Sequence, residues 1–461
     1  MSQIEAQESV ERESRWKQYS AYKDSGIEWL GEIPEHWEVK KLKHISSIQF
    51  SNVDKITVDG EKPVRLCNYS DVYNNDFITA DLNYMEATAT PNEIAKFSIR
   101  EGDVIITKDS ESWDDIAVPA YVTSNIQGVV CGYHLAQVRA YTKWIDGKYL
   151  FRSFASFGIN DQFQIAATGV TRYGLGKYWL DNSMFLVPPI EEQLAITTFL
   201  DCETSRIDTL IARKQRQIEL LQEKWAALIS HAVTKGLNPD VKMKDSGIEW
   251  LGEIPEHWEI IKFAYISNVV RGASPRPAGD PRYFDGDYIS WITVGEVTKD
   301  EKVYLSATDT MLTEEGAKNS RTINSGTLIL TNSGATLGVP KILLITGCAN
   351  DGIVAFERLS KKANKFFLYF YLSSLTENLR DRIKQGGGQP NLNTDIIKAL
   401  NVPFPPINEQ HAIATFLDKE SQRIEVMISK VKESIDKLQE YRIALISAAV
   451  TGKIDVRKEV S

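Results

Sequence analysis

Several signatures of catalysis and of export are missing from this chain of 461 residues. The sequence has no GxxxxGK[ST] phosphate loop, no GxSxG and no HExxH, which mark common nucleotide-binding, serine-hydrolase and zinc-protease sites. Its first 20 residues have no apolar core, and no apolar run approaches the roughly 20 residues that span a bilayer. We therefore expect a cytoplasmic protein that carries no catalytic centre of its own.

Cysteine and histidine are scarce and scattered. Cys67, Cys131, Cys202 and Cys348 form no CxxC pair, so we expect reduced thiols and no disulfide framework. The six histidines are spread along the chain, and His36 and His257 each precede a tryptophan. We expect them to be hydrogen-bonded packing residues, and we predict no metal site and no cofactor in this chain.

Positive charge is also in deficit. The formal net charge of −9 argues against a generic nucleic-acid coat, which is usually basic. It does not exclude DNA binding through a local patch.

The most informative feature that is present is a duplication. The segment KDSGIEWLGEIPEHWE runs from Lys23 to Glu38 and recurs unchanged from Lys244 to Glu259. Behind each copy lies a second match: PPIEEQLAITTFLD from Pro188 is echoed by PPINEQHAIATFLD from Pro405. The stretches between these ends differ in sequence. This pattern predicts one frame built twice, which carries two different domains.

The segments after each Pro-Pro pair have helical periodicity. Glu191–Leu200 predicts one helix, and a second, longer helix should begin near Thr204. Apolar residues then recur at alternating steps of three and four, with Lys214 and Arg442 as the exceptions. This spacing predicts a coiled-coil seam in each arm, and two-fold related units would make the arms antiparallel. The seam comprises Ile207, Ile211, Ile218, Leu221, Trp225 and Leu228 in the first arm and Ile424, Ile428, Val431, Ile435, Leu438 and Leu445 in the second. A long helix packed on a globular domain is the alternative.

The stretches between the frame segments are typical of mixed α/β domains. Residues 104–107, 288–292 and 327–331 are short β-rich runs, whereas 149–157 and 366–375 are aromatic-rich and should be helical. Loops rich in glycine or proline lie beside the strands, notably residues 272–281 and 386–390.

The order of these segments resembles the specificity subunit of type I restriction–modification enzymes. The resemblance rests on the repeated segment, on the two Pro-Pro-Ile-x-Glu-Gln helix starts, and on the closing segments at 169–175 and 386–392. It implies a non-catalytic reader of double-stranded DNA. Such a reader would hold two modification subunits that use S-adenosylmethionine to methylate adenine. It would also recruit restriction subunits, which are translocase–nucleases that use ATP and Mg²⁺.

We therefore predict two target-recognition domains joined by two long helices in an antiparallel coiled coil. The expected boundaries are an N-terminal extension at 1–22, recognition domains at 23–187 and 238–404, and spacer helices at 188–237 and 405–455. An arm helix from about 204 to 233 would be roughly 45 Å long, which suits two half-sites about one DNA turn apart. Because the domains differ in sequence, the target should be asymmetric, with an unread gap between its halves.

Base reading should fall to polar side chains on loops, with Arg on guanine and Asn or Gln on adenine. The candidates are Lys108, Arg172 and Tyr173 in the first domain and Arg271, Ser274, Arg276, Asn332, Gln389 and Asn391 in the second. For any single one, a solvated surface role is the alternative. Two other classes of protein also stay open: a coiled-coil scaffold that displays two protein-binding domains, and an enzyme fused to its own specificity module.

Overall fold

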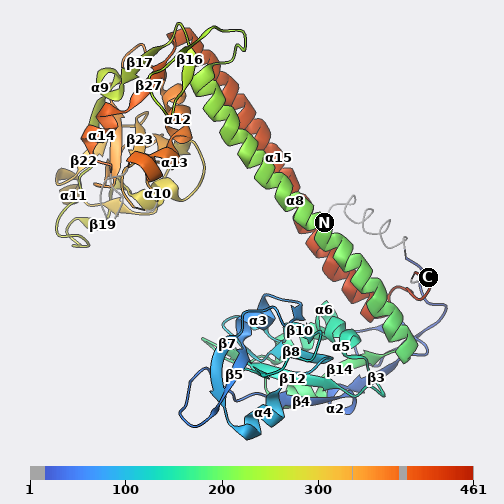
Figure 1. Ribbon diagram of the computed structural model, residues 1–461. Helices are drawn as coiled ribbons and strands as arrows, with labels where there is room; N and C mark the ends of the chain where they lie inside the picture. The colour runs from blue at the N-terminus through green and yellow to red at the C-terminus, as the bar shows by residue number, and fades with distance from the viewer. Residues whose placement is uncertain (1–15, 335, 384–391, 460–461) are drawn as a thin grey trace. The chain divides into compact units, whose positions relative to one another are not determined.

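The chain forms two compact units, seen in a computed structural model that describes residues 16–334, 336–383 and 392–459 (Figure 1). Unit 1 comprises residues 1–214 and 432–461, and unit 2 comprises residues 215–431. Two long helices, α8 (Ile190–Lys235) and α15 (Ile407–Val450), each belong partly to one unit and partly to the other. We call these helices the arms. Each unit thus combines a mixed α/β domain with part of both arms.

The prediction that the first arm forms two successive helices, Glu191–Leu200 and one from near Thr204, was wrong. Helix α8 is continuous for 46 residues. Its polar stretch at 201–204 suggested a break, but these side chains hold the neighbouring domain. Asp201 pairs with Lys148 and Arg152, and the Thr204 hydroxyl lies 3.3 Å from Arg152 Nη2. No glycine or proline occurs there, so nothing in the backbone interrupts the helix.

The domain of unit 1 is built on a five-stranded sheet of order β4-β12-β8-β10-β6. Its central strand, β8, reads DVIIT and is buried along its whole length. A three-stranded sheet, β11-β5-β7, packs a second core, and β14 returns to pair with β3. The strands are β1 (Tyr22–Asp24), β2 (Glu32–Pro34), β3 (Glu38–Lys41), β4 (Ser46–Phe50), β5 (Lys62–Cys67), β6 (Phe77–Ile78), β7 (Met85–Ala89), β8 (Asp103–Thr107), β9 (Asp109–Ser110), β10 (Pro119–Val122), β11 (Val129–Cys131), β12 (Leu135–Ala140), β13 (Tyr173–Gly174) and β14 (Met184–Val187). The helices are α2 (Leu42–Ile45), α3 (Tyr69–Tyr73), α4 (Pro91–Phe97), η1 (Trp113–Asp115), α5 (Gly147–Phe154), α6 (Phe157–Ala166) and α7 (Lys177–Asn182).

The domain of unit 2 repeats the five-stranded sheet, whereas its second sheet has four strands in the order β21-β19-β25-β22. Its five-stranded sheet, β18-β26-β23-β24-β20, has the same strand directions as the first: three antiparallel pairs and one parallel pair at the β20 edge. The strands are β15 (Met243–Asp245), β16 (Glu253–Pro255), β17 (Glu259–Lys262), β18 (Asn268–Arg271), β19 (Phe284–Ile292), β20 (Tyr304–Leu305), β21 (Met311–Leu312), β22 (Arg321–Ile323), β23 (Leu328–Thr331), β24 (Pro340–Leu343), β25 (Gly347–Ala349), β26 (Ile353–Glu357) and β27 (Asn401–Phe404). The helices are α9 (Phe263–Ile266), α10 (Val294–Thr298), α11 (Glu314–Lys318), α12 (Lys365–Ser374), α13 (Thr376–Asn378), η2 (Leu379–Ile383) and α14 (Thr394–Ala399). The predicted α/β class and internal repeat are therefore confirmed.

Within the two domains, the predicted strands and helices fall where the sequence placed them, with one difference. The runs at 104–107, 288–292 and 327–331 lie in β8, β19 and β23, and the run at 366–375 lies in α12. The helix expected at 149–157 is two helices, because α5 ends at Phe154 and α6 begins at Phe157.

The arms pack against each other inside each unit. In unit 1 the early part of α8 shares a core with the end of α15, whereas in unit 2 the end of α8 shares a core with the early part of α15. This pairing is antiparallel, as predicted. All the predicted seam residues are buried or partly buried, whereas apolar residues off the seam, such as Leu210, Leu220 and Val426, are exposed.

Candidate nucleic-acid interface

The two domains share a pattern of backbone hydrogen bonds at the end of their central strands. In unit 1, Lys108 follows β8. Its N–H donates to the carbonyl of His134 (3.0 Å), and its carbonyl accepts from the N–H of Leu175 (2.8 Å). Three segments that are distant in sequence therefore meet at one point. We call this point, with residues 50, 108, 109, 133, 134, 172 and 173, corner 1.

The same pattern of backbone hydrogen bonds exists in unit 2. Asn332 follows β23, donates its N–H to the carbonyl of Gly352 (2.9 Å), and accepts from the N–H of Leu392 (2.8 Å). Residues 271, 274, 276, 332 and 351 surround this point, which we call corner 2. The backbone places the two corners in equivalent positions of their domains, whereas the side chains differ.

Corner 1 holds a lysine between aromatic rings. The Lys108 ammonium lies 4.4 Å from the ring centroid of Tyr133 and 5.4 Å from that of Phe50, and 3.8 Å from Asp109 Oδ2. Its side chain is 11% exposed. Cation–π attraction and a nearby carboxylate stabilise a partly desolvated cation, so the position of this ammonium is restrained.

The second cation of corner 1 is more exposed. Arg172 Nη2 lies 3.2 Å from His134 Nδ1, which in turn lies 3.2 Å from Asp109 Oδ2. Because Nδ1 cannot both donate to Asp109 and accept from Arg172, the His134 tautomer selects one of these contacts. Tyr173, in β13, pairs with Ser110 of β9 and sits beside this group. The three first-domain residues predicted from sequence therefore lie together.

Corner 2 is organised by an acidic side chain. Asp351 Oδ1 accepts from the Ser274 hydroxyl (2.8 Å), and Oδ2 accepts from Arg276 Nη2 (3.1 Å). The Asp351 carbonyl accepts from Arg271 Nε (2.5 Å). The Arg276 side chain is 71% exposed, so its guanidinium is held at one edge and accessible elsewhere. Three of the predicted second-domain residues thus converge on one aspartate that the sequence did not single out.

The remaining second-domain candidates have different settings. Asn332 is fully buried, and its side-chain amide donates to the carbonyl of Leu392 (3.1 Å). In this conformation it supports the chain beneath corner 2. Gln389 and Asn391 lie outside the described residues. A direct base contact by any of the candidates stays a prediction.

Sequence reasoning missed Asp109, Tyr133, His134 and Asp351. Their signal is positional: Tyr133 and His134 come directly before buried strand β12, and Asp351 lies two residues before β26. In an antiparallel pair, the residues that precede one strand lie close to the residue that follows the other strand. Once the strand order is known, this rule locates these residues.

The Glu-Gln pair at the start of each arm connects the arm to the repeated segment and to the domain. We call this set of contacts the junction. In unit 1 the carboxylate of Glu192 accepts from the Tyr19 hydroxyl (2.6 Å) and Trp37 Nε1 (2.9 Å), and lies 2.7 Å from His36 Nε2. The Gln193 side chain accepts from the N–H of Asp146 (2.8 Å), the N-cap residue of α5. Burial and the hydrogen bond to Glu192 raise the pKa of Tyr19 well above its usual range, so this phenol remains a proton donor.

Unit 2 repeats this junction less completely. The Gln410 side chain accepts from the N–H of Asn364 (2.7 Å), the N-cap residue of α12. Glu409 Oε2 lies 2.8 Å from His257 Nε2, whereas buried Trp258 Nε1 has no hydrogen-bond partner among the described residues. His36 and His257 are thus both hydrogen-bonded, as predicted, but their side chains are 41% and 46% exposed, so the packing role predicted for them was wrong.

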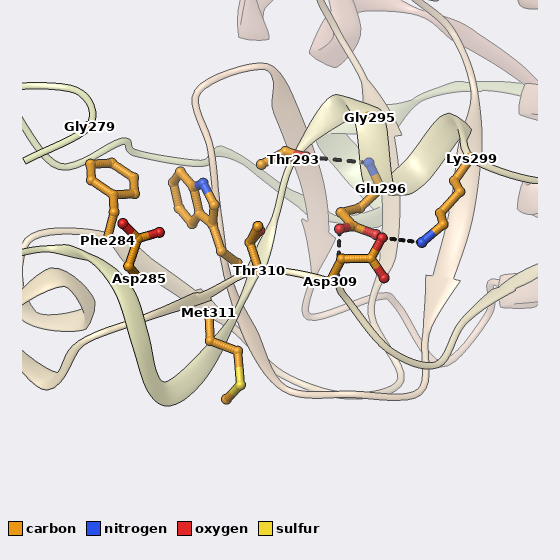
Figure 2. A pocket seen from close by; sticks show the side chains of 11 residues that line it. Gly279, Phe284, Asp285, Thr293, Gly295, Glu296, Lys299, Asp309, Thr310 and Met311 are labelled. Carbon is orange, nitrogen blue, oxygen red and sulfur yellow. Dashed lines mark hydrogen bonds and ion pairs between the residues drawn. The ribbon is translucent and has the colours of Figure 1, made fainter. Parts of the chain in front are cut away.

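A pocket of about 480 Å³ lies in unit 2 beside β19, β21 and α10 (Figure 2). Phe284 and Trp291 form its aromatic side, with ring centroids 5.9 Å apart in an edge-to-face arrangement. On its polar side, Lys299 pairs with Asp309, and the N–H of Asp309 donates to Glu296 (2.8 Å). These charged groups satisfy one another, and none of the lining side chains forms a nucleophile–base pair.

The described part of the chain contains no helix that is both long and apolar enough to cross a membrane. Within the same ranges, no group of three or more His, Cys, Asp or Glu side chains is placed to hold a metal ion.

The chain combines a repeated frame, paired arms and two corners with unlike polar side chains. This architecture is typical of a class of protein that has two separate recognition domains. Residues 255–437 match the family described as type I restriction modification DNA specificity domain. The chain is 26% identical over 443 residues to a putative type I restriction enzyme MjaX specificity subunit of Methanocaldococcus jannaschii, covering 93% of this chain and 96% of the relative. It is 23% identical to the MjaVIII specificity subunit of the same organism, covering 92% and 94%.

Solved structures agree on the fold. A chain from a structure on complex assembly and conformational transition of the type I R-M system matches with a TM-score of 0.67 at 15% identity, covering 91% of this chain and 98% of that one. The HsdS subunit from Thermoanaerobacter tengcongensis matches with a TM-score of 0.52 at 16% identity, covering 92% and 98%. Over nearly its whole length the chain is therefore similar in sequence to type I restriction enzyme specificity subunits, and it shares the fold of the solved HsdS subunit.

Proposed function

We propose that this chain acts as a specificity subunit that reads an asymmetric, bipartite DNA target, with one half-site at each corner. The supporting observation is that equivalent backbone positions carry unlike side chains. Lys108 of corner 1 stands where corner 2 has Asn332, and His134 stands where corner 2 has Gly352. Two readers with one geometry and different chemistry would recognise two different short sequences.

The exposed groups suit base edges in the major groove. Arg172 and Arg276 each present a guanidinium that can donate two hydrogen bonds to guanine O6 and N7. Asp351 is an acceptor that could receive a hydrogen bond from cytosine N4, provided that it releases Arg276 or Ser274 on binding. Each pair of contacts of this kind discriminates by about 1–3 kcal/mol.

The repeated frame supplies two similar surfaces for partners. In this proposal two modification subunits dock on the duplicated junctions and methylate adenine with S-adenosylmethionine. Restriction subunits then act as ATP- and Mg²⁺-dependent translocase–nucleases. The chain itself performs no catalysis, and it works in the cytoplasm, where it meets chromosomal DNA.

The test is a methylation assay with and without partners. The purified chain alone should neither methylate nor cut DNA. With a modification subunit and S-adenosylmethionine, it should direct adenine methylation to a site with two unlike halves and a fixed gap. Turnover by a preparation shown to be free of partners would refute the non-catalytic role. Absence of salt-dependent binding to duplex DNA would favour a protein-binding scaffold instead.

A further inference from the structure

Unit 1 carries a concentrated basic surface, although its domain is not basic as a whole. A hollow of about 810 Å³ is lined by Lys40, Lys41, Lys43, His44 and Trp144. Lys143 lies beside it, with its ammonium 5.0 Å from the Trp144 ring centroid. Glu38, an exposed side chain, pairs with Lys40 and offsets part of this charge. We call this surface, together with α7, the basic track.

Specific contacts hold the track in place. Lys43 and Lys41 both donate to Asn182 Oδ1 at the end of α7, at 3.0 and 3.4 Å. The Lys40 ammonium lies 4.4 Å from the Trp144 ring centroid. The cations are therefore arranged around an indole that is itself 38% exposed. Stacked and hydrogen-bonded lysines of this kind lose less entropy on binding than fully free ones.

The track begins at corner 1. Leu175, whose N–H binds the carbonyl of Lys108, lies two residues before Lys177, where α7 begins. Tyr178 and Trp179 on this helix are 70% and 54% exposed. Helix α7 then ends at Asn182, the residue that Lys41 and Lys43 contact. Six helical residues rise about 9 Å, so the cations continue outward from the reading corner on one domain.

Lysine-rich surfaces fit a phosphate backbone better than a protein. Lysine is depleted at the cores of protein interfaces, whereas lysine and arginine supply most phosphate contacts on DNA. Exposed aromatic rings are compatible with the sugar–phosphate edge of a groove.

The duplication argues further against a protein partner that docks twice. From Glu38 and Glu259 onward the two copies align residue by residue, so Lys40, Lys43 and His44 correspond to Ile261, Ala264 and Tyr265, whereas Lys41 corresponds to Lys262. The junction glutamates and glutamines, by contrast, occur in both units. A subunit that binds both halves should use the shared features. Because Lys40, Lys43 and His44 have no cationic counterpart in unit 2, these positions do not suit a subunit that docks in the same way on both halves.

We infer that the basic track binds the phosphate backbone of duplex DNA next to the half-site read by corner 1, and that the contact in unit 2 is weaker because Ile261 and Ala264 replace Lys40 and Lys43. This inference rests on the proposed DNA-reading function. It assigns part of the affinity to contacts that carry no base specificity, and it makes the footprint unequal at the two half-sites.

The test removes three charges from the full chain, co-expressed with its modification subunit. The variant is Lys40→Gln with Lys43→Gln and Lys143→Gln. The matched control, Lys262→Gln with Lys361→Gln and Lys362→Gln, removes the same charge from the corresponding segments of unit 2. Binding is measured against salt on specific and non-specific duplexes, and phosphate contacts are mapped by ethylation interference. A Lys→Arg triple variant tests for rescue.

The track variant should bind specific and non-specific DNA more weakly by the same factor. Its log K versus log salt slope should fall by about 0.9 for each phosphate that the variant no longer neutralises. Interference should disappear at phosphates beside the first half-site, and the Lys→Arg variant should restore it, while the control leaves those phosphates unchanged. Unchanged slope and interference would overturn the inference, as would normal DNA binding combined with failure to assemble with the modification subunit. If the unaltered complex selects no bipartite site, the proposed function itself fails, which is a distinct result.

Discussion

Substitution of Glu192 provides the sharpest test of what holds the repeated segment against the first arm. The duplication supplies the control, because Glu409 is the equivalent residue of the second arm. The side chain is 5% exposed, and its carboxylate accepts hydrogen bonds from Tyr19, which is 6% exposed, and from fully buried Trp37. Glu192→Ala would leave both buried donors without this acceptor. Each unsatisfied donor costs about 1–3 kcal/mol, so the junction should lose about 2–6 kcal/mol.

Glu409→Ala should destabilise the junction of unit 2 much less. The Glu409 side chain is 28% exposed and pairs with His257, which is 46% exposed. Exposed ion pairs contribute about 0–1 kcal/mol. Trp258 Nε1 has no hydrogen-bond partner among the described residues, so the Glu409 substitution removes no hydrogen bond from this indole.

Hydrogen exchange followed by mass spectrometry can measure each junction separately, since a chain with two units need not unfold in one transition. Glu192→Ala should accelerate exchange in β1–β3 by roughly 30-fold or more, which corresponds to about 2 kcal/mol at 1.4 kcal/mol per tenfold. Glu409→Ala should change exchange in β15–β17 by less than about fivefold. Equal effects at the two junctions, or a larger effect in unit 2, would show that buried hydrogen bonds to Glu192 do not hold the frame.

Three further predictions concern the readers and the arms. Arg172→Ala or Arg276→Ala should cost about 1–3 kcal/mol at one base pair of the target, measured by competition between single-base variants; equal weakening on every sequence would reassign that residue to phosphate contact. Four residues inserted after Gln215 in α8, with four inserted after Val431 in α15, add about 6 Å of helix and should lengthen the unread gap by about one or two base pairs; an unchanged gap in a folded, active variant would show that the arms do not set the spacing. A half-chain of residues 1–240 should form a homodimer that directs methylation to a palindrome of the first half-site; a stable monomer by light scattering, or methylation of the parental asymmetric site, would contradict the pseudo-two-fold arrangement.

The structure strengthens the half-chain prediction. The end of α15 contributes Leu445, Ile446, Ala449 and Val450 to the core of unit 1. The end of α8 carries the same four residue types in the same order, beginning at Leu228. A second half-chain therefore offers an equivalent apolar surface, and burial of each large aliphatic side chain contributes about 1.5–3 kcal/mol.

Two seam positions differ between the arms: Lys214 aligns with Val431, and Trp225 aligns with Arg442. Arg442 pairs with Asp208 in the arm and with Asp76 in the domain, whereas the aligned residue of the half-chain is Trp225. Trp225→Arg in the half-chain should therefore tighten its dimer by about 1 kcal/mol or less, since partly exposed ion pairs are weak.

Much of the fold could be predicted from sequence because its signals are periodic or repeated. The exact recurrence of Lys23–Glu38 gives the frame, and the three-four spacing from Ile207 onward gives the seam. The failure at residues 201–204 has a physical cause. A polar stretch reads as a break in an amphipathic pattern, but Asp201 and Thr204 face the buried guanidinium of Arg152 on α5. Tertiary contacts there replace the apolar periodicity.

The candidate site was predictable only in part. Loop arginines such as Arg276 are recognisable by type, and glycine- and proline-rich surroundings mark their loops. Asp351 has no such signal, because its importance comes from the strand order that brings residues 271–276 beside it. Asn332 looked like a base reader, yet it lies in the interior, since the residue that follows a central strand can be covered by the segment packed over it.

Replacement of one domain is the decisive test of two independent readers on one repeated frame. Residues 45–185 would be exchanged for the matching domain of a relative, leaving both arms and their Glu-Gln pairs unchanged. Adenine methylation would then be mapped on DNA carrying many candidate sites, with the modification subunit present. We expect one half-site to change while the other half-site and the gap remain. Simultaneous change of both half-sites, or a target that does not change, would contradict the independence of the two readers.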